Sequence, residues 1–315
     1  MRDLRIVFMG TPDFAVAILD KLIEENYNVV GVITAPDKPA GRGRKIQYSA
    51  VKTYALEKGL HILQPTNLKD ESFINELTAL EDNLQIVVAF RMLPKVVWQL
   101  PAYGTFNLHA SLLPNYRGAA PINWAIINGE TKTGVTSFFI DEKIDTGAMI
   151  LQEEIAIDEK DTAGTLHDKL MHLGASVVVK TVNLIENDEV TTTLQNDNEI
   201  TKDAFKIHKD TCKINWNNTT ANVYNFIRGM SPYPTAWTLL KQQDENFNIK
   251  VYEVAKDMSE VKQKPGTIVT TKKTIKVATT DGYINLKEIQ MPGKKKMPVS
   301  AVLNGFTFEE GAYLE

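Results

Sequence analysis

The feature that most constrains the fold is a repeated alternation of short apolar runs with amphipathic segments over the first 190 residues. The runs are five or six residues long and mostly aliphatic, so each predicts a buried strand rather than a helix. Strand, helix and strand in repetition predict a parallel α/β sheet with right-handed crossovers. The runs span residues 4–9, 29–33 and 85–90, and helical spacing of apolar side chains covers residues 14–25, 50–58 and 72–80.

Further segments complete this first domain. Thr11 is expected to cap the first helix, with Pro12 in its first turn. Strands are expected at residues 104–109 and 134–140, and a long helix at 163–186 is expected to close the domain. The residues that follow, 187–198, are polar and Thr-rich without periodicity, which is typical of a linker.

The pattern changes after a short predicted helix at residues 220–230. Alternating segments follow, separated by Pro-Gly, Lys-Lys and Asp-Gly turns, at residues 249–254, 266–271, 274–280 and 282–289. Several short strands at such spacing predict a small antiparallel, OB-like β-barrel. We therefore expect an α/β, Rossmann-like parallel-sheet domain over residues 1–188, a linker over 189–206 and the barrel domain over 207–315.

The composition narrows the class of protein. With 43% hydrophobic and 23% charged residues among 315, and a net charge of −4, the chain is not mainly disordered. Its one cysteine, Cys212, excludes an intramolecular disulfide framework and a multi-cysteine zinc site. His167 and His172 lie five residues apart and do not share a helix face, so no metal site is expected.

The amino end carries charges where a signal peptide has its apolar core. No run approaches the roughly 18 apolar residues of a membrane helix. We expect a soluble, cytoplasmic protein without a membrane partner, and at this size a monomer.

Charge is distributed unevenly along the chain. Residues 1–200 hold 18 Lys and Arg against 27 Asp and Glu, whereas residues 201–315 hold 17 against 12. A basic second half suggests a polyanionic partner, although such an excess is also an ordinary solubilising surface. Residues 38–45 place four positive charges among glycines and a proline, which predicts a mobile basic loop.

Nucleotide-binding fingerprints are absent. Gly10 follows the first strand, but the second and third glycines of a dinucleotide motif are missing, and no GxxxxGK[ST] loop occurs. Dehydrogenase and NTPase functions are therefore poorly supported. A doubly wound sheet without these motifs still binds its ligand at the carboxyl ends of its strands.

Polar residues stand at the carboxyl ends of two predicted strands. Asn107 and His109 are two residues apart, so both project from the same face of the strand at 104–109. An amide donor beside an imidazole can stabilise negative charge that develops on a carbonyl oxygen. Asp145 follows the strand at 134–140, where a carboxylate can orient an imidazole or help to move a proton. Each residue alone is also compatible with a core pair or a turn former.

The motif N-x-H-x-S-L-L-P at residues 107–114, with D-T-G at 145–147, resembles the formyltransferase family that uses 10-formyltetrahydrofolate. The resemblance runs from Arg5 to near Leu286, which is most of the chain. It implies that Asn107 and His109 stabilise a tetrahedral oxyanion and that Asp145 positions His109 and assists proton transfer. No metal is implied. The residues implied to bind the folate donor are Ser111, Leu112, Leu113, Pro114, Phe90, Met92, Leu93, Asp141 and Ile144.

Three further segments resemble the members of that family whose acceptor is initiator methionyl-tRNA, used in translation initiation. They are residues 36–45, 117–122 and 227–237, and the purine-pathway relatives have no comparable barrel. The resemblance implies that the barrel and the basic loop hold tRNA through phosphate contacts. The residues implied to bind tRNA are Arg42, Arg44, Lys45, Arg117 and Arg228. Arg91 stands where the family commonly has a small residue, and we expect it to alter the rim of the pterin pocket.

Two alternatives remain open from the sequence. One is a formyltransferase or hydrolase of the same fold with another acceptor, namely a sugar-nucleotide amine, glycinamide ribotide or water. The other, from a different class, is a non-catalytic RNA-binding protein, in which loss of Asn107, His109 or Asp145 would be natural. All three residues are present.

Overall fold

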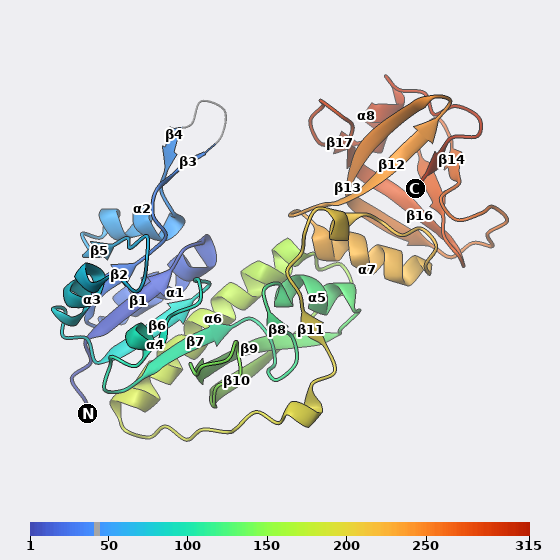
Figure 1. Cartoon of the computed structure of the whole chain (residues 1–315). Coiled ribbons are helices and arrows are strands. Elements are labelled where there is room, and N and C mark those ends of the chain that lie inside the picture. Colours follow the sequence, from blue (N-terminus) through green and yellow to red (C-terminus); the bar gives the residue numbers. More distant parts are fainter. Residues whose placement is uncertain (41–44) are drawn as a thin grey trace. The chain divides into compact units, whose positions relative to one another are not determined.

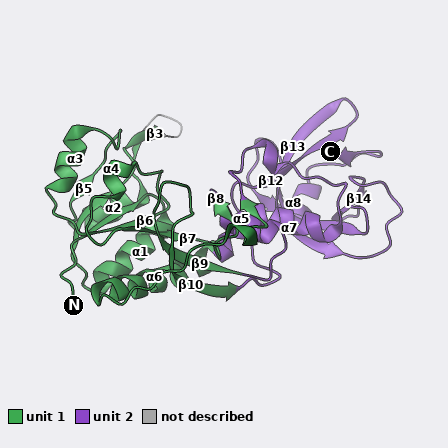
Figure 2. Ribbon diagram, turned by 60° about the horizontal axis from the view of Figure 1, so that its bottom comes forward, with its two compact units in different colours: residues 1–118, 133–155, 167–203 green, residues 119–132, 156–166, 204–315 purple. Residues whose placement is uncertain are grey.

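The computed structural model describes residues 1–40 and 45–315. The chain forms two compact units that do not follow each other simply along the sequence (Figure 2). Unit 1 contains Met1–Gly118, Thr133–Ile155 and His167–Asp203. Unit 2 contains Ala119–Lys132, Ala156–Leu166 and Ala204–Glu315.

Within the described residues, unit 1 is built on a seven-stranded sheet of order β10-β9-β7-β6-β1-β2-β5 (Figure 1). The pairs β1–β2, β2–β5, β1–β6 and β6–β7 are parallel, and β9 joins β7 antiparallel. The chain adds β2 and β5 on one side of β1 and then β6 and β7 on the other, so the strand order reverses at β1. The strands are β1 (Ile6–Gly10), β2 (Val29–Ile33), β5 (Ile62–Leu63), β6 (Leu84–Val88), β7 (Thr105–His109), β9 (Lys132–Phe139) and β10 (Met149–Ala156).

Helices cover the two faces of this sheet as the alternation of side chains requires. Val7 and Met9 of β1 pack in one apolar cluster with Phe73 of α3 and Val97 of α4. On the opposite face Leu108 lies against α6, because a Cβ added to Gly174 would sit 2.7 Å from Leu108 Cδ2. The helices with residues in unit 1 are α1 (Asp13–Glu24), α2 (Ala50–Glu57), α3 (Glu71–Thr78), α4 (Lys95–Trp98) and α6 (Ala163–Glu186), of which α6 begins in the range of unit 2.

The predicted Rossmann-like sheet is confirmed, and its elements differ from the sequence expectation in local ways. Helix α1 begins one residue after Pro12, which occupies the N-cap position, and no side-chain hydrogen bond caps it. The capping role predicted for Thr11 is therefore wrong. Helix α4 and strand β10 were not predicted, because α4 has only four residues and β10 alternates buried and exposed side chains only in part.

A short hairpin stands where a basic loop without strands is predicted. Strands β3 (Lys38–Ala40) and β4 (Lys45–Gln47) pair antiparallel, with Lys38 opposite Gln47. Figure 1 shows this hairpin projecting from the rest of unit 1. The predicted mobility concerns a segment whose centre, residues 41–44, lies outside the described residues.

Unit 2 contains the predicted antiparallel barrel. Its strands follow the order β14-β15-β16-β13-β12-β18, and β17 pairs with β16. A bridge between Thr267 and Tyr313, with Leu314 N donating to Gly266 O at 2.8 Å, brings the two ends of this order together and nearly closes the barrel. The strands are β12 (Ala236–Gln242), β13 (Glu245–Asp257), β14 (Ile268–Thr270), β15 (Ile275–Ala278), β16 (Tyr283–Gln290), β17 (Met297–Pro298) and β18 (Tyr313–Leu314).

Helix α7 packs against the apolar interior of this barrel. Val223, Ile227 and Met230 of α7 are buried in one cluster with Trp216 and with strand residues such as Ile249. The Thr219 side chain caps α7 by accepting a hydrogen bond from Asn222 N. The other helices of unit 2 are α5 (Pro121–Ile127), α8 (Val299–Leu303) and the single turn η2 (Asp210–Cys212).

Short elements join these parts of the chain. They are β8 (Arg117–Gly118), which pairs with β11 (Asp203–Ala204), and the turn η1 (Asp197–Glu199). Among the helices of the described ranges, none combines the length and the apolar character that crossing a membrane requires.

Candidate active site

The candidate site lies at the carboxyl end of β7. Asn107 is opposite Val87 in the parallel pairing of β6 and β7, so both side chains share one face of the sheet. Val87 packs in the cluster that contains Leu93 and Val97. Asn107, and His109 two residues later, therefore project on the face of α3 and α4, away from α6. The sequence prediction of a shared face agrees with this register.

His109 is buried, with 7% of its surface exposed, and both of its ring nitrogens face oxygen atoms. Nε2 lies 2.8 Å from the carbonyl oxygen of Tyr116. Because a carbonyl oxygen only accepts, Nε2 carries the hydrogen and donates. In the neutral ring Nδ1 is then the basic nitrogen, and it lies 3.8 Å from Asp145 Oδ2. This arrangement lets Nδ1 take up a proton beside a carboxylate that stabilises the resulting charge.

The ring of His109 is held by groups of the protein, whereas the side-chain amide of Asn107 is available to a ligand. The side chain is half-buried, and no partner for its amide group is found within residues 1–40 and 45–315. A buried or half-buried amide normally finds a hydrogen-bond partner within the protein or in solvent. The free amide of Asn107 can therefore donate to an oxygen atom of a bound ligand.

Asp145 is held in position by the turn around it. Its Oδ2 accepts a hydrogen bond of 2.9 Å from Gly118 N, and its φ of 56° lies in the left-handed region. Gly147 explains why a glycine follows, because a Cβ there would lie 1.6 Å from the carbonyl oxygen of Phe139. The D-T-G motif is thus a turn pressed against the end of β9, and it aims the Asp145 carboxylate at His109.

The turn after His109 is fixed by side chains of the neighbouring strands. Ser111 is fully buried and its hydroxyl donates to Asn115 O at 2.8 Å. Thr136, opposite His109 on β9, donates to Ser111 O at 2.7 Å and accepts from Leu113 N at 3.2 Å. Ser111, Leu113 and Pro114 are buried. Leu112 is half-buried. These residues shape the wall of the site.

Two segments beside Asn107 carry the apolar residues predicted to face the pterin. Leu93 belongs to the cluster around Val87, and Phe90 packs against that cluster. Met92 and Ile144 are exposed at 70% and 59%, respectively. Large apolar side chains with this much exposure next to a polar centre are suited to cover a flat ligand.

The loop at 141–145 is organised from within and tied to the segment after β6. Asp141 Oδ1 accepts from Lys143 N at 3.0 Å and from Thr146 Oγ1 at 2.7 Å. Glu142 forms an ion pair with Lys95, the first residue of α4. That pair holds the two predicted walls of the pterin pocket near each other, and Asp141 acts as a turn former.

Arg91 is bound to the segment after β5. Its guanidinium donates to Thr66 O at 2.9 Å and to Pro65 O, and it lies 5.6 Å from the centre of the Phe90 ring. Burial lowers the pKa of Arg91. Because its donors are engaged with the segment after β5, Arg91 is held beside the Phe90 ring.

The residues predicted to bind tRNA have different environments. Arg42 and Arg44 lie outside the described residues, and Lys45 is the first residue of β4. Arg117 donates from Nε and Nη2 to Gln195 Oε1 at 2.9 and 2.7 Å, and its Nη1 lies 3.0 Å from Asp197 Oδ1. These contacts place Arg117 inside unit 1's own hydrogen-bond network.

Arg228 does not offer its guanidinium to a partner. It is 8% exposed, and it donates to Asn225 Oδ1 and to Asp161 O, each at 2.9 Å. Burial lowers its pKa. Arg228 is thus an internal crosslink of unit 2, and this arrangement argues against the phosphate contact that the sequence predicts for it.

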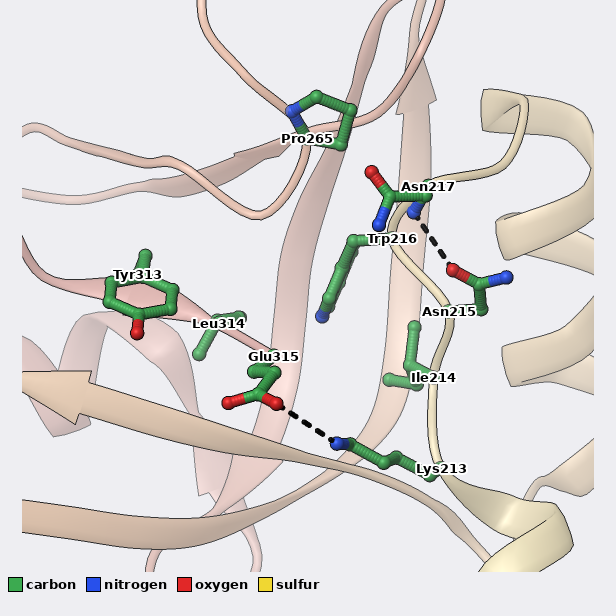
Figure 3. A pocket seen from close by; sticks show the side chains of 9 residues that line it. All are labelled: Lys213, Ile214, Asn215, Trp216, Asn217, Pro265, Tyr313, Leu314 and Glu315. Atoms are coloured by element: carbon green, nitrogen blue, oxygen red, sulfur yellow. Dashed lines mark hydrogen bonds and ion pairs between the residues drawn. The ribbon is translucent and has the colours of Figure 1, made fainter.

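Two hollows on the described surface lie in unit 2. One of about 390 Å³ is lined by residues such as Lys213, Trp216, Pro265 and Glu315 (Figure 3). Lys213 and Glu315 of this hollow pair at 3.8 Å, and Trp216 Nε1 donates to Thr238 outside it. No group of three His, Cys, Asp or Glu side chains suited to a metal ion occurs in the described part of the chain.

Comparison with known proteins agrees with the two-part fold. Residues 4–182 match the Formyl transferase family, and residues 206–307 match the Formyl transferase, C-terminal domain family. A methionyl-tRNA formyltransferase of Flavobacterium johnsoniae is 62% identical over 313 residues, covering 99% of both chains. This chain belongs to the formyltransferase family. A second methionyl-tRNA formyltransferase, from Bacteroides thetaiotaomicron, is 55% identical to this formyltransferase and covers 98% of both chains.

Solved structures share the fold of this formyltransferase at low sequence identity. WlaRD, a sugar 3N-formyl transferase crystallised with dTDP and 5-N-formyl-THF, gives a TM-score of 0.65 at 21% identity, covering 94% of this chain and 100% of its own. HypX from Aquifex aeolicus in complex with tetrahydrofolic acid gives 0.65 at 16%, covering 96% of this chain and 47% of its own. The α/β unit and the barrel are thus a recurrent combination.

Some residues that build the formyltransferase site were not found from the sequence. Thr136 fixes the Ser111 turn, and Gly118 supplies the backbone N–H that holds Asp145. Thr136 lay within a predicted strand, but its pairing with His109 depends on the register of β7 and β9. Gln195 lies in the predicted linker and contacts the D-T-G turn, and no local pattern in the sequence marks it.

Proposed function

We propose that this formyltransferase moves the formyl group of 10-formyltetrahydrofolate to the α-amino group of methionine on initiator methionyl-tRNA. One observation carries the proposal. The free amide of Asn107 stands at the end of β7 beside buried His109, whose Nδ1 faces Asp145 at 3.8 Å. The relatives that match along nearly the whole chain are named methionyl-tRNA formyltransferases. This activity belongs to translation initiation and hence to the cytoplasm.

In the proposed reaction the methionyl amine attacks the formyl carbon, and the carbonyl oxygen becomes a tetrahedral oxyanion. The amide of Asn107 donates to that oxygen, and His109 adds stabilisation through the positive charge that it gains on taking up the proton of the attacking amine. The amine loses one proton, which Nδ1 of His109 accepts while Asp145 stabilises the imidazolium. The bond to the folate nitrogen then breaks, and the same proton passes to that leaving nitrogen.

The folate donor is proposed to bind against the segments that follow β6 and β9. Phe90 and Leu93 lie in the apolar cluster beside Asn107, and Met92 and Ile144 present exposed apolar surface. Such surface favours a flat, partly apolar ring. In the turn after His109, Leu112 is half-buried and has surface available to the donor. Ser111, Leu113 and Pro114 are buried and fix the shape of the turn.

The tRNA acceptor is proposed to be held partly by the basic segment at residues 38–45, of which residues 41–44 lie outside the described residues. Arg42, Arg44 and Lys45 supply the charge for phosphate contacts, which would make binding dependent on salt. Residues 201–315 add 17 basic against 12 acidic residues. Arg117 and Arg228 are not included, because their donors engage groups of the protein itself.

The test measures formyl transfer from 10-formyltetrahydrofolate to aminoacylated initiator tRNA by the full chain. Elongator methionyl-tRNA, a sugar-nucleotide amine and glycinamide ribotide serve as competing acceptors, and release of formate reports reaction with water. We expect transfer to initiator methionyl-tRNA with a preference of at least tenfold over each other acceptor. Transfer to a small amine alone, or release of formate alone, would keep the formyl chemistry and overturn the tRNA assignment.

A further inference from the structure

The strongest unassigned feature of unit 1 is a closed set of hydrogen bonds around Gln195. This residue stands in the segment after α6 that the sequence pattern presents as a plain linker. Its side chain is half-buried, whereas its neighbours on either side are exposed. Polar side chains in a free linker remain solvated, so this burial indicates a specific contact.

The carboxamide of Gln195 contacts both carbonyl groups that frame the D-T-G turn. Nε2 donates to Asp145 O and to Gly147 O, each at 2.9 Å. Its two hydrogens thus bind the backbone on both sides of Thr146. The turn is the one in which Asp145 adopts a left-handed φ of 56°. A conformation that an aspartate seldom adopts persists only where its surroundings hold it.

The acceptor oxygen of Gln195 is used as fully as its donors. Arg117 donates to Gln195 Oε1 from Nε at 2.9 Å and from Nη2 at 2.7 Å. The next residue, Gly118, donates its backbone N–H to Asp145 Oδ2 at 2.9 Å. The contacts therefore close a ring that runs from Arg117 through Gln195 and Asp145 to Gly118.

The backbone of the same segment is also attached near the turn. Thr193 and Met149 exchange two backbone hydrogen bonds of 2.9 Å, two residues before Gln195 and two residues after Gly147. Asp197 accepts from Arg117 Nη1 at 3.0 Å. The segment from 193 to 197 is thus fixed at three points, and Gln195 stands between the other two.

We propose that Gln195 is a positioning residue that holds the Asp145 turn, and through it the carboxylate beside His109, in the geometry for formyl transfer. The inference rests on the proposed function. A carboxamide is suited to the place because it donates twice and accepts from a guanidinium, which neither a carboxylate nor an ammonium group does. Misplacing a catalytic group by about 1 Å costs up to roughly 10²-fold in rate.

Two substitutions separate this role from simple support of Arg117. Gln195→Glu keeps an acceptor for Arg117 but loses both donors and places negative charge against two carbonyl oxygens. Gln195→Leu removes the donors and the acceptor. If Gln195 positions Asp145, both variants lower kcat about tenfold or more and leave KM for each substrate within about threefold. If Gln195 only anchors Arg117, Gln195→Glu retains the wild-type kcat, which would overturn the proposal.

A double-mutant cycle adds a readout that a general loss of stability does not move. Arg117→Met is measured alone and together with Gln195→Leu. We expect the effects on kcat to be non-additive, with Arg117→Met costing less than about twofold once Gln195 is gone. Independent, additive effects would contradict the ring.

The neighbouring residue supplies the matched control. Asn196 hydrogen bonds only within its own segment, to Asn198 N and to Glu199 Oε1, among the contacts found in the described ranges. Asn196→Ala is therefore expected to retain the wild-type kcat, and thermal melting checks that all variants are folded. A wild-type chain that transfers no formyl group would contradict the proposed function, whereas an active wild type with an unaffected Gln195→Glu variant would contradict only the role of Gln195.

Discussion

Two buried polar side chains of this formyltransferase, His109 in unit 1 and Arg228 in unit 2, are used in opposite ways. Arg228 donates to the carbonyl oxygens of Asp158 and Asp161 and to Asn225, and it lies 5.7 Å from the ring centre of Tyr224. In His109, Nε2 donates a hydrogen bond to the carbonyl oxygen of Tyr116. The other ring nitrogen, Nδ1, lies 3.8 Å from Asp145 Oδ2, beyond hydrogen-bond distance.

The difference is that Arg228 makes its hydrogen bonds with the protein itself, whereas His109 and Asn107 keep hydrogen-bonding groups available to a ligand. The Arg228 guanidinium crosslinks backbone around it, so its value lies in the stability of unit 2. At His109 a basic nitrogen is kept beside a carboxylate, and Asn107 keeps a free amide in the same strand. Catalysis needs such groups held in place before the substrate arrives and not yet committed to the protein.

The largest effect is expected at His109. His109→Ala should lower kcat for formyl transfer by roughly 10²–10³, because the proton acceptor and one stabilising group for the oxyanion are lost. Steady-state assays with initiator methionyl-tRNA measure this change. The exposed His61 provides the control, since His61→Ala should retain wild-type kcat. A His109→Ala variant with nearly full activity would remove the distinction between the two regions.

At Arg228 the effect is expected on stability. Arg228→Met keeps the length of the side chain but removes its hydrogen bonds to the carbonyl oxygen of buried Asp161 and to Asn225, so the free energy of unfolding should fall by about 1–3 kcal/mol. Chemical denaturation measures this, with Lys262→Met as an exposed control. KM for tRNA in the folded protein should stay within about twofold. A higher KM with unchanged stability would instead restore Arg228 as a tRNA contact.

The smallest effect is expected at Arg91, which belongs to neither class. Its guanidinium is engaged with the carbonyl oxygens of Pro65 and Thr66, outside the predicted pterin pocket. Arg91→Ala should therefore change KM for 10-formyltetrahydrofolate by less than about threefold. Measurement of KM at saturating tRNA checks this, and a tenfold change would place Arg91 at the rim of the pocket after all.

Much of the fold could be predicted because its signals are local. The apolar runs and helical patterns of the first half repeat often enough to predict a parallel sheet, and the helix expected at residues 163–186 has the bounds of α6. Elements that depend on partners were missed. Strand β12, for example, buries every second residue between β13 and β18. The buried positions include the polar residues Thr238 and Gln242, so the strand shows no apolar alternation in the sequence.

The candidate site divides in the same way. The shared face of Asn107 and His109 follows from their spacing alone, and the D-T-G turn follows from its residue types. The roles of Arg117, Arg228 and Gln195 depend on contacts between residues far apart in the chain. Arg117 and Gln195 are 78 positions apart, and Arg228 and Asp161 are 67 apart. The contacts of Gln195 with the D-T-G turn span 48 and 50 positions. The hydrophobic periodicity of the sequence gives no information on contacts between residues so far apart. A cation in the sequence therefore looks the same whether it binds phosphate or crosslinks the fold.

The central claim is that the free amide of Asn107 stabilises the oxyanion of formyl transfer. The most direct test is a single-turnover measurement with enzyme in excess over methionyl initiator tRNA and saturating 10-formyltetrahydrofolate, comparing the wild type with Asn107→Ala and the nearly isosteric Asn107→Asp. We predict that both variants melt like the wild type and that their transfer rates fall by roughly 10² or more, with Asn107→Asp at least as slow because its charge repels the oxyanion. Wild-type transfer rates in either variant would contradict the account.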